Sequence, residues 1–193
     1  MTELNQQVAE LAARFGEPRR VEVLIRPFFD PVQKPDRFAE VCMVIRRRNG
    51  KLLLSIKTFY PRGAYRLPTG GIHRGEPILD ALRRETQEET GLETETKRFL
   101  AWISYRAVEA PEGPALFHTF AFLLDEVGGR FHTSDVDEQI EDWIEVESSA
   151  LDEVAEGLDR IPSARSRNIG GDWADWGHFR AIVHRVVYEE LTN

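Results

Sequence analysis

One stretch of this chain, residues 70–92, constrains its fold more than any other: GGIHRGEPILDALRRETQEETGL. It joins a glycine-rich loop to a segment whose apolar residues recur at helical spacing. Pro77 suits the first turn of a helix, because its missing N–H would have no intrahelical partner there. Gly91 suits the position just past a helix end, where a positive φ is favoured. The stretch therefore predicts a loop followed by a helix that ends before Gly91.

Three carboxylates of the predicted helix, Glu85, Glu88 and Glu89, stand at positions i, i+3 and i+4 and share one face. Like charges at this spacing destabilise a helix by roughly 0.2–0.5 kcal/mol per pair. A hard divalent cation such as Mg²⁺ binds carboxylate oxygens and offsets that repulsion. The alternative for a bare Glu-x-x-Glu-Glu is a solvated acidic face. The neighbouring glycines and arginine make a metal site a stronger alternative than the carboxylates alone would.

The same residues resemble the Nudix box, G-x5-E-x7-R-E-U-x-E-E-x-G-U, in which U is a bulky apolar residue. Eight positions are in register, namely Gly70, Glu76, Arg84, Glu85, Glu88, Glu89, Gly91 and Leu92. Thr86 departs from the pattern, because the family usually has an aliphatic residue there, and we interpret it as a packing variation. Thr69 stands where many members have an additional glycine.

The resemblance implies an α/β/α sandwich with a mixed central β-sheet, together with helices at the N- and C-terminal ends of this chain. Composition alone predicts only a mixture of α and β. The periodicity predicts helices over 3–15, 149–158 and 173–191, and strands over 21–28, 38–46, 51–59, 98–108, 116–127 and 142–146. Asn49-Gly50 predicts a tight turn, and Gly128-Gly129 is expected to turn the chain after the strand over 116–127. We expect one domain over residues 1–193, with an N-terminal extension (1–36) and a C-terminal helical extension (162–193).

Nudix enzymes hydrolyse a nucleoside diphosphate linked to another group, by attack of water on phosphorus. The resemblance implies that Glu85, Glu88 and Glu89 are the principal ligands of Mg²⁺ or Mn²⁺, with Glu85 also a candidate base. It implies that the Gly70 backbone approaches the metal through its carbonyl.

Two further residues of the box have supporting roles by the same resemblance. Arg84 would orient Glu85, and Glu76 would pair with Arg84 and fix the loop against the helix. A structural role is favoured for Glu76 and Arg84, and Gly91 is also assigned a structural role.

The general base of this family often lies outside the box, in a loop before a later strand. The acidic run 135–142 of this chain occupies that place. Glu138 and Glu141 are the two candidates, with Glu138 slightly ahead. A solvated acidic loop is the alternative for both.

Three weaker candidates for substrate binding are Arg66, Arg62 and Tyr105. Arginine binds phosphate, but any surface arginine can do so, and a tyrosine that could stack on a base is also a common core residue. The marks of ADP-ribose, dinucleoside polyphosphate and coenzyme A subgroups are absent. The expected substrate is therefore a small nucleoside diphosphate derivative of unspecified kind.

The whole chain limits partners and location. A net charge of −8 argues against a broad nucleic-acid-binding face, and no signal peptide or membrane span is visible, so we expect a cytoplasmic enzyme. Homodimerisation is common in the family and is a hypothesis here. One rival function is a nucleotide-binding sensor without catalysis. Another is an isoprenyl diphosphate isomerase, which needs a catalytic cysteine, whereas Cys42 lies in an apolar run and reads as a core thiol.

Overall fold

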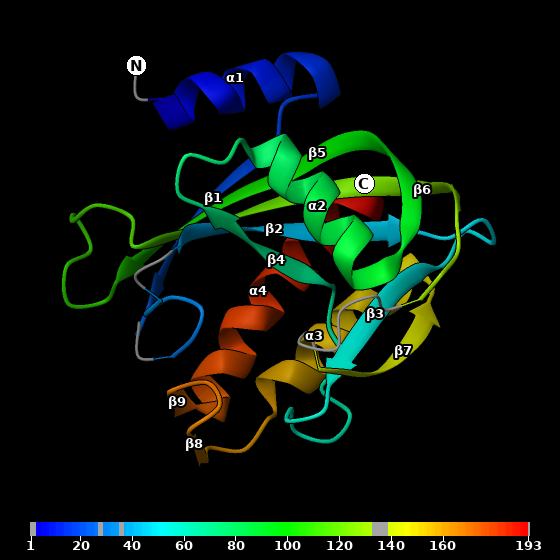
Figure 1. The fold of residues 1–193 in the computed structure, drawn as a ribbon. Helices are drawn as coiled ribbons and strands as arrows, with labels where there is room; N and C mark the ends of the chain where they lie inside the picture. The colour runs from blue at the N-terminus through cyan, green and yellow to red at the C-terminus, as the bar shows by residue number, and fades with distance from the viewer. Residues whose placement is uncertain (1–2, 27–28, 35–36, 133–138, 193) are drawn as a thin grey trace.

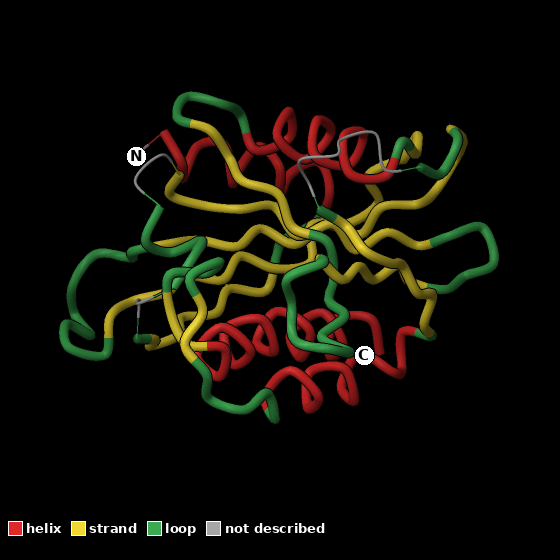
Figure 2. Tube along the Cα trace, turned by 60° about the horizontal axis from the view of Figure 1, so that its bottom comes forward, coloured by secondary structure: helices red, strands yellow, loops and turns green. Residues whose placement is uncertain are grey.

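Helices cover both faces of a central β-sheet (Figures 1 and 2). A computed structural model describes residues 3–26, 29–34, 37–132 and 139–192. Helices α1 (Glu3–Phe15) and α2 (Ile78–Thr90) lie on one face, and α3 (Leu151–Asp159) and α4 (Trp173–Thr192) lie on the other. Each face of the sheet therefore has its own hydrophobic core.

The sheet has the strand order β1-β5-β6-β2-β3-β7, and β4 pairs with β2 outside this path. The strands are β1 (Arg19–Ile25), β2 (Arg37–Arg46), β3 (Leu52–Lys57), β4 (Thr69–His73), β5 (Leu92–Ala107), β6 (Phe117–Gly129) and β7 (Ile140–Val146). The pairs β1–β5 and β2–β6 are parallel, whereas the other pairs are antiparallel. The α/β/α sandwich with a mixed sheet is thus confirmed.

Strand β2 has two neighbours along one of its edges. Its C-terminal end pairs with β3 at Arg46 and Leu52, and its N-terminal half pairs with β4. The segment before β4 runs between these two neighbours, where Ser55 and Arg66 exchange two backbone hydrogen bonds of 2.9 Å. The pairing of β2 with both β3 and β4 along one edge therefore fixes the position of β4 and of the Arg66 backbone.

Alternate side chains of β2 enter the two cores. Val41 and Met43 pack on the side of α1 and α2, and Cys42 and Val44 pack on the side of α3 and α4. A strand buried on both faces reads as a continuous apolar run, as this one does. Cys42 is fully buried and free, so the prediction of a core thiol is confirmed.

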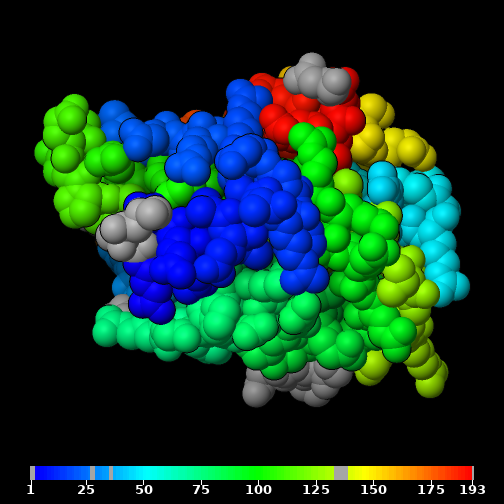
Figure 3. All heavy atoms as spheres, turned by 90° about the horizontal axis from the view of Figure 1, so that it is seen from above, coloured from blue at the N-terminus to red at the C-terminus, as the bar shows by residue number. Residues whose placement is uncertain are grey.

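The predicted N-terminal helix over residues 3–15 is confirmed as α1. Val8 and Leu11 are its buried anchors in the core shared with α2. The space-filling view from above shows α1 on the outside of this layer, beside the segment that contains α2 and the start of β5 (Figure 3).

The predicted hairpin about Asn49-Gly50 is confirmed, but the expectation for Gly128-Gly129 was wrong. Both glycines are the last residues of β6 and pair with Glu93 and Leu92 at the start of β5. A Cβ on Gly129 would lie 2.5 Å from the carbonyl oxygen of Gly91. The glycine permits this close backbone approach. Strand β5 begins at Leu92 instead of near residue 98, because the residues from Leu92 onward pair with the end of β6.

The C-terminal segment contains a short hairpin that the sequence did not predict. A 3₁₀ turn (η2, Ser148–Ala150) precedes α3, and β8 (Arg165–Ser166) and β9 (Gly171–Asp172) pair within the polar stretch before α4. Helix α4 packs Trp176, Phe179 and Val187 into the core of its face. Among the described helices, none has the length and apolar character that a membrane crossing needs.

Candidate active site

The glycine loop and the carboxylate helix form the unit that the sequence predicted. Strand β4 places Gly70 and Gly71 beside Val41 and Glu40 of β2. Helix α2 follows, with Pro77 immediately before its first residue and Gly91 after its last, at φ 65°. The Gly91 N–H donates to the carbonyl of Gln87 at 2.9 Å. The glycine terminus of the helix is thereby confirmed.

The apolar face of α2 holds the helix against the sheet. Ile78, Ala81 and Leu82 are at most 1% exposed and join the core that includes β2 and β6. Thr86 is buried among them, and its hydroxyl donates to the carbonyl of Leu82 at 2.7 Å. Thr86 therefore fills a packing position and satisfies its hydroxyl within the helix.

Glu85 lies directly against Gly70. A Cβ built on Gly70 would lie 2.1 Å from Cδ of Glu85 and 2.3 Å from its Oε2. Only a glycine leaves room for the carboxyl group at this place, because any side chain would occupy the same volume. The loop and the helix therefore bring the backbone of β4 and the carboxylate of α2 together.

Arg84 links the loop to the carboxylates. Its Nε and Nη2 donate to the two oxygens of Glu76 at 2.8 and 2.9 Å, and its Nη1 donates to Glu85 Oε1 at 2.7 Å and to Glu88 Oε2 at 3.0 Å. Its Nη2 also donates to the carbonyl of Gly71 at 2.9 Å. One guanidinium group thus joins β4, the loop before α2 and two helical carboxylates.

Glu76 is fixed from both sides. Its Oε2 also accepts from the N–H of His73 at 2.9 Å. The hydrogen bond from Arg84, aided by this N–H, holds the pKa of Glu76 below its usual range. A bidentate carboxylate–guanidinium pair of this kind fixes orientation as well as charge.

The three carboxylates differ in exposure. Glu85 is 7% exposed and Glu89 is 2% exposed, whereas the side chain of Glu88 is 47% exposed. Within the part of the chain that the structure describes, no three acidic, histidine or cysteine side chains converge as a ready metal cage. Arg84 Nη1 contacts an oxygen of Glu85 and an oxygen of Glu88. The donor chemistry nevertheless fits Mg²⁺ or Mn²⁺, since the carboxylates of α2 and the backbone carbonyl of Gly70, which lies against Glu85, are hard oxygen donors.

Of the two candidates for the general base, the structure describes Glu141, which belongs to β7. Glu141 is exposed on this strand, between two residues that pair with β3. Glu138 lies outside the described residues.

The three weaker substrate candidates lie in different places. Arg66 is 2% exposed and donates to Tyr60 Oη at 3.1 and 3.0 Å and to Thr69 Oγ1 at 3.1 Å, beside β4. Tyr105 is 1% exposed, with its ring 4.6 Å from that of Phe179, so it is packed in the core.

Arg62 lies apart from the box. It is exposed and lines a pocket of about 320 Å³ between the loop before β4, β7 and α3. None of the residues lining that pocket belongs to the box.

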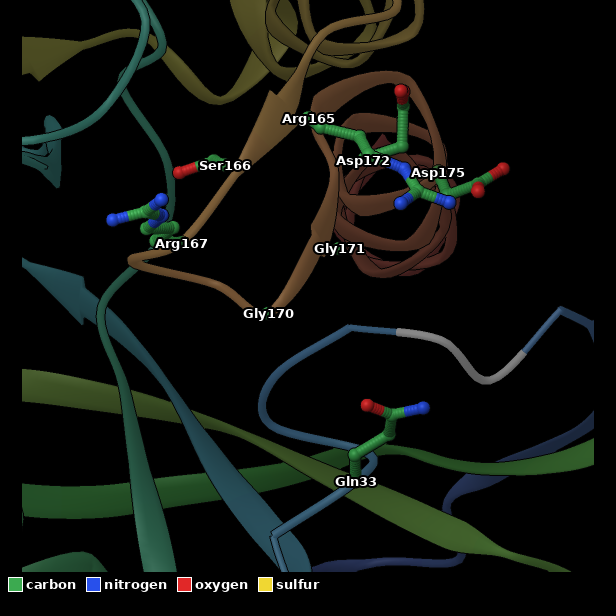
Figure 4. Close-up of a pocket in the computed structure, with 8 residues that line it drawn as sticks. All are labelled: Gln33, Arg165, Ser166, Arg167, Gly170, Gly171, Asp172 and Asp175. Carbon is green, nitrogen blue, oxygen red and sulfur yellow. The ribbon is translucent and has the colours of Figure 1, made fainter.

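A larger pocket, of about 760 Å³, also lies away from the carboxylates. Figure 4 shows Gln33 of the N-terminal loop facing the β8–β9 hairpin across it. Arg165, Arg167 and Asp172 of the hairpin line it, but no residue from 70–92 does. It is therefore not the site at which the glutamates act.

Sequence reasoning missed one buried ion pair near β4. Arg180 of α4 donates from Nη1 to Glu40 Oε1 of β2 at 2.7 Å, and the two side chains are 5% and 4% exposed. Thr119 Oγ1 donates to the same carboxylate oxygen at 3.0 Å. The sequence did contain a sign of this pair. Glu40 is a charge inside an apolar strand and Arg180 is a charge on an apolar face of a helix, and such charges are seldom buried unless they are paired.

Comparisons with known proteins agree with the box. The chain is 33% identical over 92 residues to the ADP-ribose pyrophosphatase of Methanocaldococcus jannaschii, covering 48% of this chain and 53% of that protein. It is 35% identical over 106 residues to the RNA pyrophosphohydrolase of Gluconobacter oxydans, covering 53% of this chain and 54% of that protein. The chain thus spans about half the length of these curated relatives.

Solved structures and a family model give the remaining comparisons. The crystal structure of a MutT NUDIX hydrolase from Burkholderia pseudomallei is similar with a TM-score of 0.49 at 21% identity, covering 81% of this chain and 98% of that chain. The family model of the NUDIX domain matches residues 36–163. With two thirds of its length matched by that model, the chain belongs to the NUDIX domain family.

Proposed function

We propose that this protein hydrolyses the diphosphate linkage of a small nucleoside diphosphate derivative, with a divalent cation, by attack of water on phosphorus. The observation that carries the proposal is the Arg84 network, which holds Glu76, Glu85 and Glu88 together beside the bare backbone of Gly70. Membership of the NUDIX domain family supports the same reaction class.

The residues of the box have separate tasks in this proposal. Glu85, Glu88 and Glu89, with the carbonyl of Gly70, would hold Mg²⁺ or Mn²⁺. When bound, the cation supplies neutralisation of the diphosphate oxygens, whose charge otherwise repels the carboxylates. Arg84 keeps Glu85 oriented through the hydrogen bond of 2.7 Å.

A base must take a proton from the attacking water. We propose Glu138 for this step, with Glu141 as the second candidate. Both belong to the acidic run that precedes or begins β7.

The substrate is proposed only as a class. The relatives carry two different names, an ADP-ribose pyrophosphatase and an RNA pyrophosphohydrolase, each aligned over about half its length. The net charge of −8 disfavours a long polyanion such as RNA. A small nucleotide derivative therefore remains the proposal, and RNA becomes one arm of the test.

The test is a panel of nucleoside triphosphates, nucleoside diphosphate sugars, ADP-ribose, dinucleoside polyphosphates, coenzyme A and 5′-triphosphorylated RNA, with Mg²⁺ or Mn²⁺. The variant is Glu88→Gln, and the matched control is Glu95→Gln, an exposed glutamate of β5 that pairs with Lys97. We expect metal-dependent turnover by wild type and control, and its loss in Glu88→Gln.

Two results would contradict the proposal. Equal turnover in Glu88→Gln and wild type would place the metal site elsewhere. Nucleotide binding by calorimetry without turnover of any compound would favour the sensor function over the hydrolase.

A further inference from the structure

A second group of charges lies next to the box, between the sheet and α4. A pocket of about 130 Å³ is bounded by β2, β4, the N-terminal loop and α4. Among the residues that the structure describes, the charged residues that line it are five cations and two carboxylates, namely Lys34, Arg37, Lys57, Arg66 and Arg180 with Asp30 and Glu40. The pocket therefore carries excess positive charge within a protein whose net charge is −8. Such a site attracts an anion.

The size of the pocket limits what enters it. Pockets that bury a drug-sized ligand have volumes of roughly 300–1,000 Å³. A volume of about 130 Å³ accommodates a group of the size of phosphate and excludes a whole nucleotide. The pocket thus suits one anionic group of a larger molecule.

Arg180 presents a donor without an acceptor. Its Nη1 is bonded to Glu40, but its buried Nε finds no acceptor among the residues that the structure describes. The residue is 4% exposed and lines the pocket. A buried donor without a partner is costly to the folded state. A bound anion with an oxygen that reached this Nε would supply the acceptor.

Arg66, another cation that lines the pocket, is held in place. Arg66 makes hydrogen bonds to Tyr60, Thr69 and the carbonyl of Leu67. The ring of Tyr60 in turn packs against Trp176 of α4, with centroids 4.7 Å apart. A charge that is fixed before binding loses little side-chain entropy when a ligand arrives.

Gly71 connects this pocket to the box. It lines the pocket, and its carbonyl accepts from Arg84 on the side of α2. The guanidinium of Arg37 lies against its α-carbon, since a Cβ there would be 2.6 Å from Arg37 Nη1. The two sites therefore share one residue of β4.

We propose that this pocket binds a phosphate group of the substrate that lies outside the bond being hydrolysed. The inference rests on the proposed hydrolase function. Lys34 and Arg180 are the residues that determine this specificity, and both lie outside residues 36–163, the part matched by the family model. Substrates that carry a further phosphate able to reach this pocket would be preferred over substrates with an uncharged group in the same place.

The first experiment measures binding of inorganic phosphate without divalent metal, in the presence of a chelator. The metal-free carboxylates of α2 repel phosphate, so binding under these conditions reports the basic pocket. NMR titration of the backbone amides localises it, and we expect shifts at Gly71, Asn168 and Ile169. Absence of shifts at these amides would overturn the proposal.

The variants are Lys34→Ala and Arg180→Lys. Lysine at position 180 keeps a positive charge opposite Glu40 but lacks the Nε donor of arginine, so this variant preserves the buried charge balance. We expect each variant to raise the phosphate Kd by about threefold to tenfold. The control Lys97→Ala removes an exposed lysine of β5 and should leave the Kd unchanged. Unchanged Kd values in both pocket variants would overturn the assignment.

Kinetics distinguish a phosphate of the substrate from a free phosphate ion. Lys34→Ala should raise KM, with little change in kcat, for substrates that carry an additional phosphate, and should leave KM unchanged for those that lack one. Equal KM values for wild type and variant with every substrate would assign the pocket to free phosphate and overturn the substrate proposal.

Glu88→Gln separates this inference from the hydrolase proposal. We expect it to abolish turnover and to keep the phosphate Kd of the wild type. A loss of phosphate binding in Glu88→Gln would place the anion at the box and overturn the pocket. No turnover by wild type, with a phosphate Kd that still responds to Lys34→Ala, would remove the hydrolase and leave the anion site.

Discussion

The carboxyl group of Glu85 occupies the place where a side chain on Gly70 would begin, since a Cβ there would lie 2.1 Å from Glu85 Cδ. Gly70→Ala must displace this carboxylate. Because a misplacement of about 1 Å can cost 10²-fold in rate, we expect kcat to fall by about that factor. Overpacking should also lower the free energy of unfolding by about 1–3 kcal/mol.

Steady-state kinetics and urea denaturation measure the two effects of Gly70→Ala. The matched control is Gly157→Ala in α3, where no atom lies within 4 Å of the added Cβ. This control should stabilise the protein by about 0.5–1 kcal/mol and leave kcat unchanged. Wild-type kcat in Gly70→Ala would contradict the proposed position of Glu85 in the reaction.

Arg84 is the second target, because its planar guanidinium serves Glu76, Glu85, Glu88 and the Gly71 carbonyl at once. Arg84→Lys keeps the charge, but a lysine ammonium group cannot reproduce the planar set of donors that makes these hydrogen bonds. With hydrogen bonds to charged groups worth about 1.5–3 kcal/mol each, we expect a loss of at least 1.5 kcal/mol of stability and a tenfold or greater fall in kcat.

The adjacent arginine is a close control for this experiment. The side chain of Arg83 is 63% exposed, and its Nη1 lies 3.7 Å from Oδ1 of Asp80. Arg83→Lys should change neither stability nor rate. Similar losses in both variants would mean that any arginine of α2 matters equally, contrary to the hydrogen-bond network.

His184 predicts a pH dependence of stability. Its Nε2 accepts from the N–H of Leu67 at 2.9 Å, and its Nδ1 lies 2.7 Å from the carbonyl of Arg180, so the buried ring is neutral. Burial, aided by the positive charges of Arg66 and Arg180, lowers its pKa to about 3. In the unfolded chain, His184 therefore binds a proton as the pH falls through about 6.5, whereas in the folded chain the ring stays neutral at that pH.

The free energy of unfolding should accordingly fall as the pH drops below about 6.5. Above that pH, His184 is neutral in both states and should no longer change the free energy of unfolding with pH. Between pH 7 and pH 5 this single group accounts for about 2 kcal/mol. His184→Gln should be less stable at pH 7 but lose less stability over this interval. The control His178→Gln reports the cost of losing an exposed histidine of the same helix. Parallel pH curves for wild type and His184→Gln would contradict the neutral buried ring.

The assignment of the general base can be tested by two glutamine substitutions. General-base catalysis contributes typically 10²–10⁴-fold, so Glu138→Gln should lower kcat by that factor and remove the acidic limb of the pH–rate profile. Glu141→Gln changes an exposed residue of β7 and should lower kcat by less than about threefold. The opposite ranking would assign the proton transfer to Glu141.

The parts that sequence analysis predicted depend on local spacing. The helix between Pro77 and Gly91, the common face of its glutamates and the turn at Asn49-Gly50 follow from residues a few positions apart. The fold class came from the family resemblance, because local patterns do not determine which strands pair.

The parts that were missed depend on contacts between distant segments. The pair Glu40–Arg180 joins residues 140 positions apart, and neither residue has a local pattern that identifies its partner. The early start of β5 was hidden by a polar run, Glu93 to Lys97, that pairs with the end of β6. The basic pocket escaped prediction because its lining residues come from segments that are far apart in the chain, from Asp30 to Arg180.

The two parallel pairings of the sheet have a consequence for how this protein folds. Strand β1 pairs with β5 and β2 pairs with β6, in each case joining residues about 80 positions apart, as Ala39 and His118 show. No tight turn can nucleate such pairs, and the entropy of closing these loops precedes any gain from the contact. Refolding is therefore expected on the millisecond-to-second scale of non-local topologies. Helix α2 forms from local contacts, but Gly70 is held beside Val41 only in the assembled sheet. Activity should return with the slow phase that pairs β2, after most helical signal has recovered.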